Sequence, residues 1–297
     1  YKGRAVIFVL GGDRNVDDKA DLAITRALAR GLEETAPKNL ITYHPRGPGR
    51  SSEALHKEPW LDFNMVQSSH TGRDYDNAVN IEHDRALKPP KPTLDGEPRY
   101  EDIVADFYYS TAQDAVRYDD TDVRFAAHSA LFAGAAGHTY GNAHIWQMWS
   151  PSQKAVLGAN VPWREAIDHP GAFQMRHVRR LFDSRPWHLC EPNGTFVVSP
   201  NPGSSGMRNR ALVAKDRSFA MVYIPRGEPV AVDIGSLGRG RITSWWWNPR
   251  YGHAHKIYEG DADAVQAFTP PSSGRGQDWV LVIDHGDRPV TPPGAAP

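Results

Sequence analysis

Residues 94–101, LDGEPRYE, set the carboxylate of Glu97 between Gly96 and Pro98. Just before Glu97, residues 91–94 predict a short buried strand that arrives from a proline-rich turn. Gly96 permits backbone conformations barred to other residues, and Pro98 removes one backbone donor and restricts the exit from the strand. A carboxylate held at the end of a strand is where barrel enzymes place catalytic acids. A solvated glutamate in a turn is the alternative interpretation of this segment.

A second segment of the same design follows the apolar run at residues 5–10, AVIFVL, where GGDRN at 11–15 presents Asp13. Continuous apolar runs of this kind are typical of strands covered on both faces. Further strands are predicted over 40–43 and 61–67, and a last strand ends in GHTYG at 137–141, with helices over 17–35, 75–87 and 121–136. Strands that alternate with helices, and polar residues at the strand ends, predict an α/β fold, a (β/α)8 TIM barrel with its site on that face.

The first helix shows apolar side chains at helical spacing, namely Ala20, Ile24, Leu28 and Leu32, and these are expected to face the core. The strand count, however, comes to about five, whereas a closed barrel needs eight. We expect the missing βα units either in a segment that precedes Tyr1 or in a second chain that supplies them; a fold that does not close as a barrel is the alternative.

From about residue 187 the sequence pattern changes, because helical periodicity stops and short β-rich runs appear between turn residues. These runs predict an antiparallel β-sandwich, and they lie at 195–199, 218–225, 230–234, 241–248 and 278–284. The predicted organisation is therefore a barrel portion over 1–186, a sandwich domain over 187–290 and a disordered tail over 291–297.

Composition excludes several classes of protein. The 297 residues carry a formal net charge of −1, so no strong field attracts nucleic acid or an anionic membrane. No apolar run approaches membrane-spanning length. Cys190 is the single cysteine, so a disulfide framework within the chain is impossible, although export of so large a protein does not require one. We expect neither nucleic acid nor a membrane as a partner.

Asp13 and Glu97 each follow a predicted parallel strand beside a glycine, and so should converge over one face. Two convergent carboxylates suit glycosidic cleavage, because one can protonate the leaving oxygen while the other attacks or activates water. The alternative for Asp13 is that it caps the helix that follows it.

Three histidines, His44, His70 and His138, also follow predicted strands. Together they could bind zinc, but no HExxH helix or HxH pair accompanies them, so hydrogen bonding to substrate or to the carboxylates is the favoured interpretation. We therefore predict neither a metal nor a cofactor. Trp146, with Tyr140 and Gln147, follows the last strand and should line the rim of the pocket.

Five motifs taken in order resemble the apiosidase-like glycoside hydrolases: LGGDRN (10–15), ITYHP (41–45), WLDFNMVQSSH (60–70), KPTLDGEPRYE (91–101) and GHTYGNAHIWQM (137–148). The resemblance implies a (β/α)8 barrel followed by a small β-sandwich that carries a collagen-binding label. In that pattern the segment starting at Ala5 would be the fourth strand, Glu97 would follow the seventh, and the first three βα units would precede Tyr1.

The resemblance further implies that Asp13 is the general acid/base and Glu97 the nucleophile of a retaining glycosidase. The residues expected to shape the pocket and bind substrate are Asn15, His44, Gln67, His70, Tyr100, His138, Tyr140 and Trp146. The expected substrate is a plant or microbial oligo- or polysaccharide containing apiose, another furanose or an uncommon sugar, and the expected location is secreted or periplasmic. The alternatives are a non-catalytic carbohydrate-binding or scaffold protein and, third, a metal-dependent hydrolase.

Overall fold

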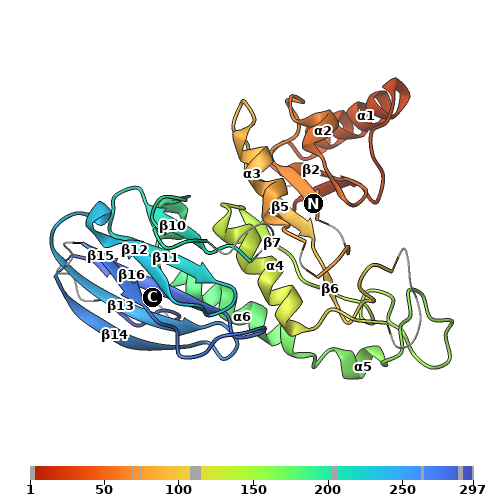
Figure 1. The fold of residues 1–297 in the computed structure, drawn as a ribbon. Helices are drawn as coiled ribbons and strands as arrows, with labels where there is room; N and C mark the ends of the chain where they lie inside the picture. The colour runs from red at the N-terminus through yellow and green to blue at the C-terminus, as the bar shows by residue number, and fades with distance from the viewer. Residues whose placement is uncertain are drawn as a thin grey trace.

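A computed structural model describes residues 4–68, 70–73, 75–107, 115–201, 207–261, 264–286 and 290–295. The first half of the chain is a mixed α/β structure, and the second half is built of antiparallel sheets (Figure 1). The boundary predicted at residue 186 falls between the last helix of the first half and the first strand of the antiparallel sheet, and its exact position stays a prediction.

The five strands predicted in the first half are all present. They are β1 (Phe8–Gly11), β2 (Ile41–His44), β4 (Asn64–Gln67), β5 (Thr93–Glu97) and β7 (Gly137–His138). Strand β1 pairs in parallel with β2, and β4, β5 and β7 pair in parallel in that order. Short strands flank them: β3 (Gly49–Arg50) runs antiparallel to β4, and β6 (Tyr100–Glu101) pairs in parallel with β8 (Gly141–Asn142). The parallel arrangement brings the carboxyl ends of the five strands to one side.

Helices connect these strands. They are α1 (Lys19–Thr35), α2 (Ser52–Leu55), α3 (Ala78–Ala86), α4 (Asp120–Phe132), α5 (Trp163–Ala166) and α6 (Pro170–Asp183), with the 3-10 turn η1 (Trp187–Leu189) after them. Asp18 caps α1 by accepting hydrogen bonds from the backbone nitrogens of Ala20 and Asp21. Asp13 therefore does not have the capping role that was its alternative interpretation.

The buried face of α1 differs from the predicted one. Ile24 and Leu28 are 60% and 54% exposed, whereas Thr25 and Ala29 are buried. Ala29 packs against the β1–β2 sheet, and its i, i+4 relation to Thr25 sets the stripe that faces the strands. The apolar periodicity of this helix contains two stripes, and the sequence pattern alone did not distinguish which of them meets the sheet.

The second half contains two packed antiparallel sheets, as predicted. One sheet has the order β14 (His253–Asp261), β13 (Arg241–Asn248), β16 (Trp279–His285), β11 (Phe219–Ile224), β10 (Arg210–Ala214) and β9 (Cys190–Pro192). The other pairs β12 (Val230–Asp233) with β15 (Val265–Phe268), and the 3-10 turn η2 (Ile234–Leu237) follows β12. The strand predicted over 195–199 is only an isolated bridge between Val197 and Val232, while β9, β10, β14 and β15 were not predicted.

The larger sheet is covered on both faces. Trp246 packs into the core between the two sheets, whereas Trp245 and Trp247 point the other way into a core shared with α4 and α6. In Figure 1 these two helices lie between the larger sheet and the parallel strands. The two halves are therefore joined by a continuous apolar core, and the sandwich is not a loosely tethered appendage.

Residues 291–295 do not have the predicted disorder. Pro293 and Gly294 are buried, and Arg180 of α6 donates a 2.9 Å hydrogen bond to the carbonyl oxygen of Gly294. Gly294 also approaches Trp247 so closely that a Cβ would lie 2.2 Å from the indole ring. Low sequence complexity suggested a free tail, but glycine at this position permits close packing; residues 296–297 lie outside the described part.

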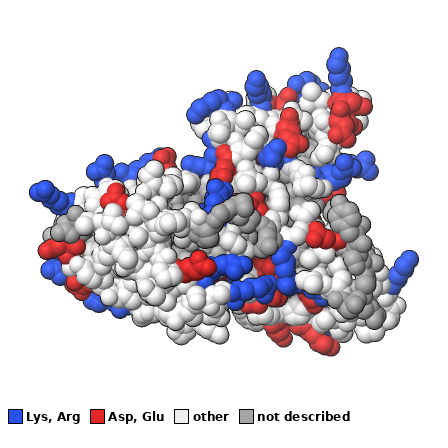
Figure 2. Space-filling view, viewed as in Figure 1, with Lys and Arg blue, Asp and Glu red and all other residues white. Residues whose placement is uncertain are grey.

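Basic and acidic side chains are interspersed over the face shown in Figure 2, in keeping with the balanced charge of the chain. In the described residues, every helix is too short or too polar to cross a membrane.

Candidate active site

Glu97 is the last residue of β5, and three side chains converge on its carboxylate. His44 Nε2 lies 2.9 Å from Oε2, and His70 Nε2 lies 3.4 Å from Oε1. The Tyr100 hydroxyl, three residues further along the chain, also donates a hydrogen bond to Glu97. His44 ends β2 and His70 follows β4, so parallel pairing brings residues from distant parts of the chain to one point.

Gly96 has a different role from the one expected. The register between β4 and β5 shifts there, since Val66 pairs with Asp95 and Gln67 with Glu97. A Cβ on Gly96 would lie 2.6 Å from Cγ of Met65, so it is lack of space and not a special backbone angle that requires glycine. The extra residue sets the direction in which Glu97 leaves the strand.

The surroundings of Glu97 keep it ionised. Burial alone would raise the pKa of this carboxyl, but hydrogen bonds from His44, His70 and Tyr100 outweigh it, and the pKa falls well below its ordinary value. The hydrogen bond with Glu97 raises the pKa of His44, although burial opposes the rise. Burial and the Glu97 charge raise the pKa of Tyr100, so its phenol stays a donor. A half-buried, ionised carboxylate held by three donors suits a nucleophile.

Asp13 lies two residues beyond β1 in a strained turn. Gly11, Gly12 and Asp13 have φ angles of 78°, 110° and 52°, which two glycines tolerate and an aspartate adopts less often. The backbone nitrogen of Asp13 lies 3.4 Å from Nδ1 of His44, so His44 accepts there and donates from Nε2 to Glu97. Asp13, His44 and Glu97 each offer one ligand-type atom, and these three atoms lie within 4.8 Å of one another.

Asp13 and Glu97 open onto one cavity of about 370 Å³. Of the predicted substrate-binding residues, Gln67, His70, Tyr100 and Trp146 line it, and His44 lies beside Glu97. Residues that the sequence interpretation missed also line the cavity, namely Arg46, Gly47, Ile103, Phe107 and Leu157. Arg46 and Gly47 lie in the loop after β2, so the rule that loops after parallel strands carry function could have found them; Ile103 and Leu157 carry no comparable signal.

Three predicted site residues lie elsewhere. Asn15 accepts a 3.0 Å hydrogen bond from the backbone nitrogen of Arg46 and so orients the loop after β2. His138 pairs in register with Asp95, and its Nδ1 lies 3.5 Å from that buried carboxylate. Tyr140 donates its hydroxyl to Glu101. These residues are placed to support the site and do not line its cavity.

The predicted histidine trio is thus divided, because His44 and His70 contact Glu97 whereas His138 contacts Asp95. The group that could hold a divalent ion consists instead of Asp13, His44 and Glu97. Two carboxylates and an imidazole are suitable zinc ligands. The absence of a metal requirement stays a prediction for the chelator experiment described below.

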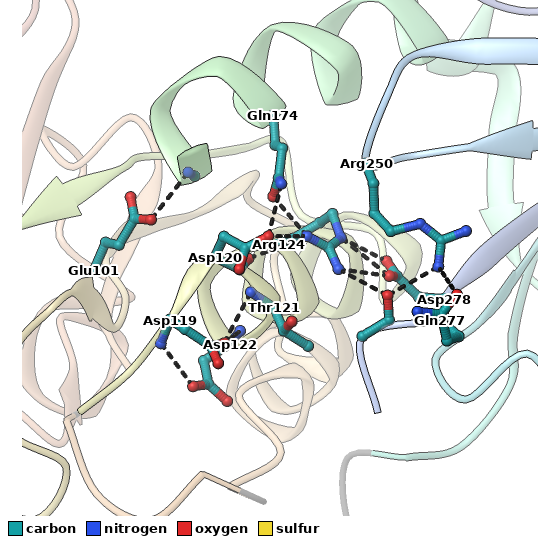
Figure 3. A network of polar contacts seen from close by, with 12 residues as sticks. Glu101, Asp119, Asp120, Thr121, Asp122, Arg124, Gln174, Arg250, Gln277 and Asp278 are labelled. Atoms are coloured by element: carbon teal, nitrogen blue, oxygen red, sulfur yellow. Dashed lines mark hydrogen bonds and ion pairs between the residues drawn. The ribbon is translucent and has the colours of Figure 1, made fainter. Parts of the chain in front are cut away.

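A buried polar network extends from the site to the sandwich (Figure 3). Glu101 accepts from the backbone nitrogen of Gly171 at the start of α6, and burial raises the pKa of its carboxyl. One turn further along α6, Gln174 accepts a 2.6 Å hydrogen bond from Arg124 of α4. Arg124 in turn binds Asp278, the residue before β16, with an Nη2–Oδ1 distance of 2.8 Å. These contacts tie the edge of the site to the antiparallel sheet.

Two family descriptions match the chain. "Apiosidase-like, catalytic domain" matches residues 1–188, and "Putative collagen-binding domain of a collagenase" matches residues 197–284. A search of the curated proteins gives no matching sequence.

Two solved structures resemble nearly the whole chain. A protein described as a glycoside hydrolase is 31% identical with a TM-score of 0.88, and the match covers 95% of this chain and 65% of that one. A glycoside hydrolase of family 5 from Bacteroides vulgatus ATCC 8482 is 30% identical with a TM-score of 0.87, and the match covers 94% of this chain and 62% of that one. The chain thus spans less than two thirds of the length of either structure.

Proposed function

Because the chain belongs to the apiosidase-like glycoside hydrolases, we propose that it hydrolyses glycosidic bonds with Glu97 as nucleophile and Asp13 as general acid and base. The observation that carries the proposal is the approach of the two carboxylates, whose nearest oxygens lie within 4.8 Å over one cavity. Retaining glycosidases have carboxyl groups about 5–5.5 Å apart, whereas inverting enzymes leave roughly 6.5–9.5 Å for a water molecule. The proposed stereochemical outcome is therefore retention.

In the first step, Glu97 attacks the anomeric carbon as the bond to the leaving oxygen breaks, and Asp13 gives its proton to that oxygen. In the second step, Asp13 takes a proton from water, and the water oxygen attacks the anomeric carbon and releases Glu97. His44 and Tyr100 hold the Glu97 carboxylate during both steps. Asp13 is exposed, which fits a residue that must exchange protons with both leaving group and water.

The proposed substrate is an oligo- or polysaccharide of plant or microbial origin that contains apiose, another furanose or an uncommon sugar. The family description supports the sugar class, and Gln67, His70 and Arg46 supply polar groups for hydroxyls on one side of the cavity. Since a polysaccharide is too large to cross a membrane, a secreted or periplasmic location is part of the proposal.

We also propose that the five parallel strands belong to a (β/α)8 barrel completed by a further segment, in the same chain or in a second one. In the described sheets β1 pairs with β2 alone, and Ile7 and Val9 are 52% and 50% exposed along it. Parallel sheets are normally covered on both faces and avoid bare edges. The greater length of the two similar structures is compatible with such a segment.

A screen of branched pectic and arabinan-type glycans tests the function. We expect release of a defined sugar whose first-formed anomer, observed by NMR, keeps the configuration of the substrate, with turnover unchanged by EDTA. An inverted anomer would contradict the nucleophile assignment, and activity lost to EDTA and restored by zinc would favour a metal-dependent hydrolase. Binding without any hydrolysis would favour the non-catalytic carbohydrate-binding alternative.

A further inference from the structure

The cavity above Glu97 has two chemically different walls. One wall follows the ends of the parallel strands and is polar, with Asp13, Arg46, Gln67 and His70 around Glu97. The other part of the lining, which we name the apolar wall, consists of Ile103, Phe107, Trp146 and Leu157. It adjoins the polar wall, because the ring centroids of Phe107 and His70 lie 5.6 Å apart. A volume of about 370 Å³ lies in the range of pockets that hold ligands larger than a single sugar ring.

The apolar wall rests on a small core of its own. Ile103, Tyr118 and Ala143 form a buried cluster, and Phe107 and Leu157 pack against it. The Tyr100 ring, which lies at the junction of the two walls, packs against the same cluster. Ile103, Phe107 and Leu157 therefore form a continuous apolar surface, and Trp146 lines the same cavity from the loop after β8.

Two side chains, Gln147 and Arg117, hold the loop that carries Trp146 and Leu157 in place. Gln147 donates to the carbonyl oxygen of Ala143 at 2.7 Å and accepts from the backbone nitrogen of Val156 at 3.1 Å. Arg117 also donates a hydrogen bond to the carbonyl oxygen of Gly158. Gln147 was expected at the pocket rim, but its side chain is used within the loop.

Backbone strain in this loop indicates that its shape is maintained by surrounding contacts. Met148 and Leu157 have φ angles of 46° and 50°, which are rare for bulky side chains. Such conformations persist where surrounding contacts over-determine them, and they cluster at ligand-binding sites. In the left-handed conformation of its backbone, Leu157 contributes its side chain to the wall.

The two walls differ in what they can offer a hydroxyl group. Gln67 lines the cavity on the polar wall, and a side-chain amide can both donate to and accept from a sugar hydroxyl. Ile103, Phe107 and Leu157 can neither donate nor accept a hydrogen bond. A hydroxyl pressed against them would lose its water without gaining a partner.

We propose that the apolar wall is a leaving-group subsite for a hydroxyl-poor substituent, an aryl or alkyl group, joined to the sugar that the polar wall holds. This inference rests on the proposed hydrolysis and departs from the saccharide substrate proposed above in the leaving group, which becomes a phenolic or other apolar alcohol. A sugar in the leaving-group position carries hydroxyls on several edges, and the wall satisfies only its C–H face.

Benzyl and methyl glycosides of the sugar identified by the screen provide the kinetic test. Both leaving groups are alkyl alcohols of similar acidity, so a difference in kcat/KM reports contact with the wall. We expect a benzyl preference of about tenfold or more, as for other apolar groups added in a matching pocket. Trp146→Ala should abolish most of this preference, because kcat/KM should fall much more for the benzyl glycoside than for the methyl glycoside.

Met148→Ala is the matched control, because Met148 lies in the same loop and is exposed but does not line the cavity. It should leave the benzyl preference unchanged. Gln147→Leu should reduce the preference, because Gln147 binds the backbone of Val156 in this loop. Gln153→Leu should not reduce it, because the Gln153 side chain binds Ser150 and not Val156. A disaccharide cleaved as well as the benzyl glycoside, or a benzyl preference that survives Trp146→Ala, would overturn the inference.

A binding measurement separates this inference from the proposed function. Saturation-transfer NMR with free benzyl alcohol should show transfer to the aromatic protons with the full chain and with Met148→Ala, and should lose it with Trp146→Ala. Absence of hydrolysis on every glycoside would reject the proposed function alone. Equal transfer to all three proteins, or none to the unmodified chain, would reject the apolar subsite whatever the activity.

Discussion

Glu97 owes its properties to the side chains that surround it at the end of β5. Two imidazoles and a phenol donate to a carboxylate that is largely shielded from water, and their combined effect outweighs the cost of burying its charge. Asp13 reaches the same cavity from a turn that only glycines make accessible, and it stays exposed. The two carboxylates therefore lie in different environments, since Asp13 is exposed and Glu97 is largely shielded.

Removal of either carboxyl group should abolish most activity without unfolding the protein. We expect Asp13→Asn to lower kcat by about 10²-fold or more, as loss of a positioned proton-transfer group does. Glu97→Gln should lower kcat by at least as much, because an amide cannot form the covalent glycosyl-enzyme intermediate. Both substitutions keep the shape of the side chain, so thermal unfolding should change little. Steady-state kinetics on the substrate found by the screen tests this expectation, and circular dichroism checks the folding of each variant. Near-normal turnover of either variant would refute the assignment of Asp13 and Glu97 as the catalytic pair.

The pH profile should reveal the link between His44 and Glu97. The pKa of Glu97 lies below its ordinary value because of hydrogen bonds that include the one from His44. His44→Asn should therefore raise that pKa and move the acidic limb of the kcat/KM profile to higher pH. His138→Asn is the matched control, because His138 lies beside Asp95. An acidic limb that stays in place in His44→Asn, or moves equally in both variants, would contradict this account.

At the scale of elements, α4 lies between two surfaces that both exclude water. Nearly all of its residues from Asp122 to Phe132 are buried, since one side meets α6 and the other meets the sandwich. His128 is fully buried on this helix, where Nδ1 binds the Arg124 carbonyl oxygen at 2.8 Å and the ring stacks on Tyr223. Burial lowers the pKa of His128 to about 4.

This buried histidine should make stability depend on pH. The unfolded chain binds a proton at His128 below its ordinary pKa of 6.5, and the folded protein does so only below about 4. Stability should therefore rise with pH across that window, by up to ~1.4 kcal/mol per pH unit from this one group. His128→Leu should remove this part of the slope. Urea unfolding between pH 4 and 7 measures how the free energy of unfolding depends on pH, and His188→Leu, at an exposed histidine, is the control. An unchanged slope in His128→Leu would show that His128 is not the source of the pH dependence.

At the scale of the whole molecule, the sandwich and the α/β half share an apolar core and a buried ion pair. Arg124 and Asp278 come from different halves, and both are almost fully buried. A buried pair contributes little net stability, but breaking it leaves an isolated charge without water. The sandwich is therefore expected to unfold together with α4 and α6.

Arg124→Met should destabilise the protein by ~3–5 kcal/mol, because Asp278 then loses its main partner in a buried position. The double variant Arg124→Met/Asp278→Leu should recover a large part of that loss, since neither charge remains. Guanidinium unfolding monitored by fluorescence compares the three proteins. A double variant as unstable as the single one would show that the buried charge is not the cause.

The open sheet edge leads to a prediction about assembly. Residues 1–297 expressed alone should be poorly soluble or self-associate, because β1 presents unpaired backbone groups next to exposed Ile7 and Val9. A longer form with the segment preceding Tyr1, in cis or in trans, should give a monodisperse and active species. Analytical ultracentrifugation compares the two; a stable, active monomer of residues 1–297 would show that the fold closes in some other way.

The positions of Asp13, His44, His70 and Glu97 could be predicted from the sequence by itself. Each follows an apolar run that forms a strand, and the carboxyl ends of parallel strands meet on one side whatever their exact register. The existence of five strands and the change to antiparallel sheets therefore needed only local patterns, whereas the catalytic roles of Asp13 and Glu97 stay a prediction. Burial of one particular stripe of α1 and order in the tail were not predictable in this way.

Only the tertiary structure decided which neighbours those strand-end residues meet. Parallel pairing sets His138 opposite Asp95, two residues before Glu97, so its imidazole misses the cavity that its position along the chain had suggested. Pairing of β6 with β8 likewise brings Tyr140 to Glu101. The apolar wall depends on packing between Ile103 and Leu157, which are far apart in sequence. Register and packing between distant segments arise from the whole chain at once, and no local pattern encodes them.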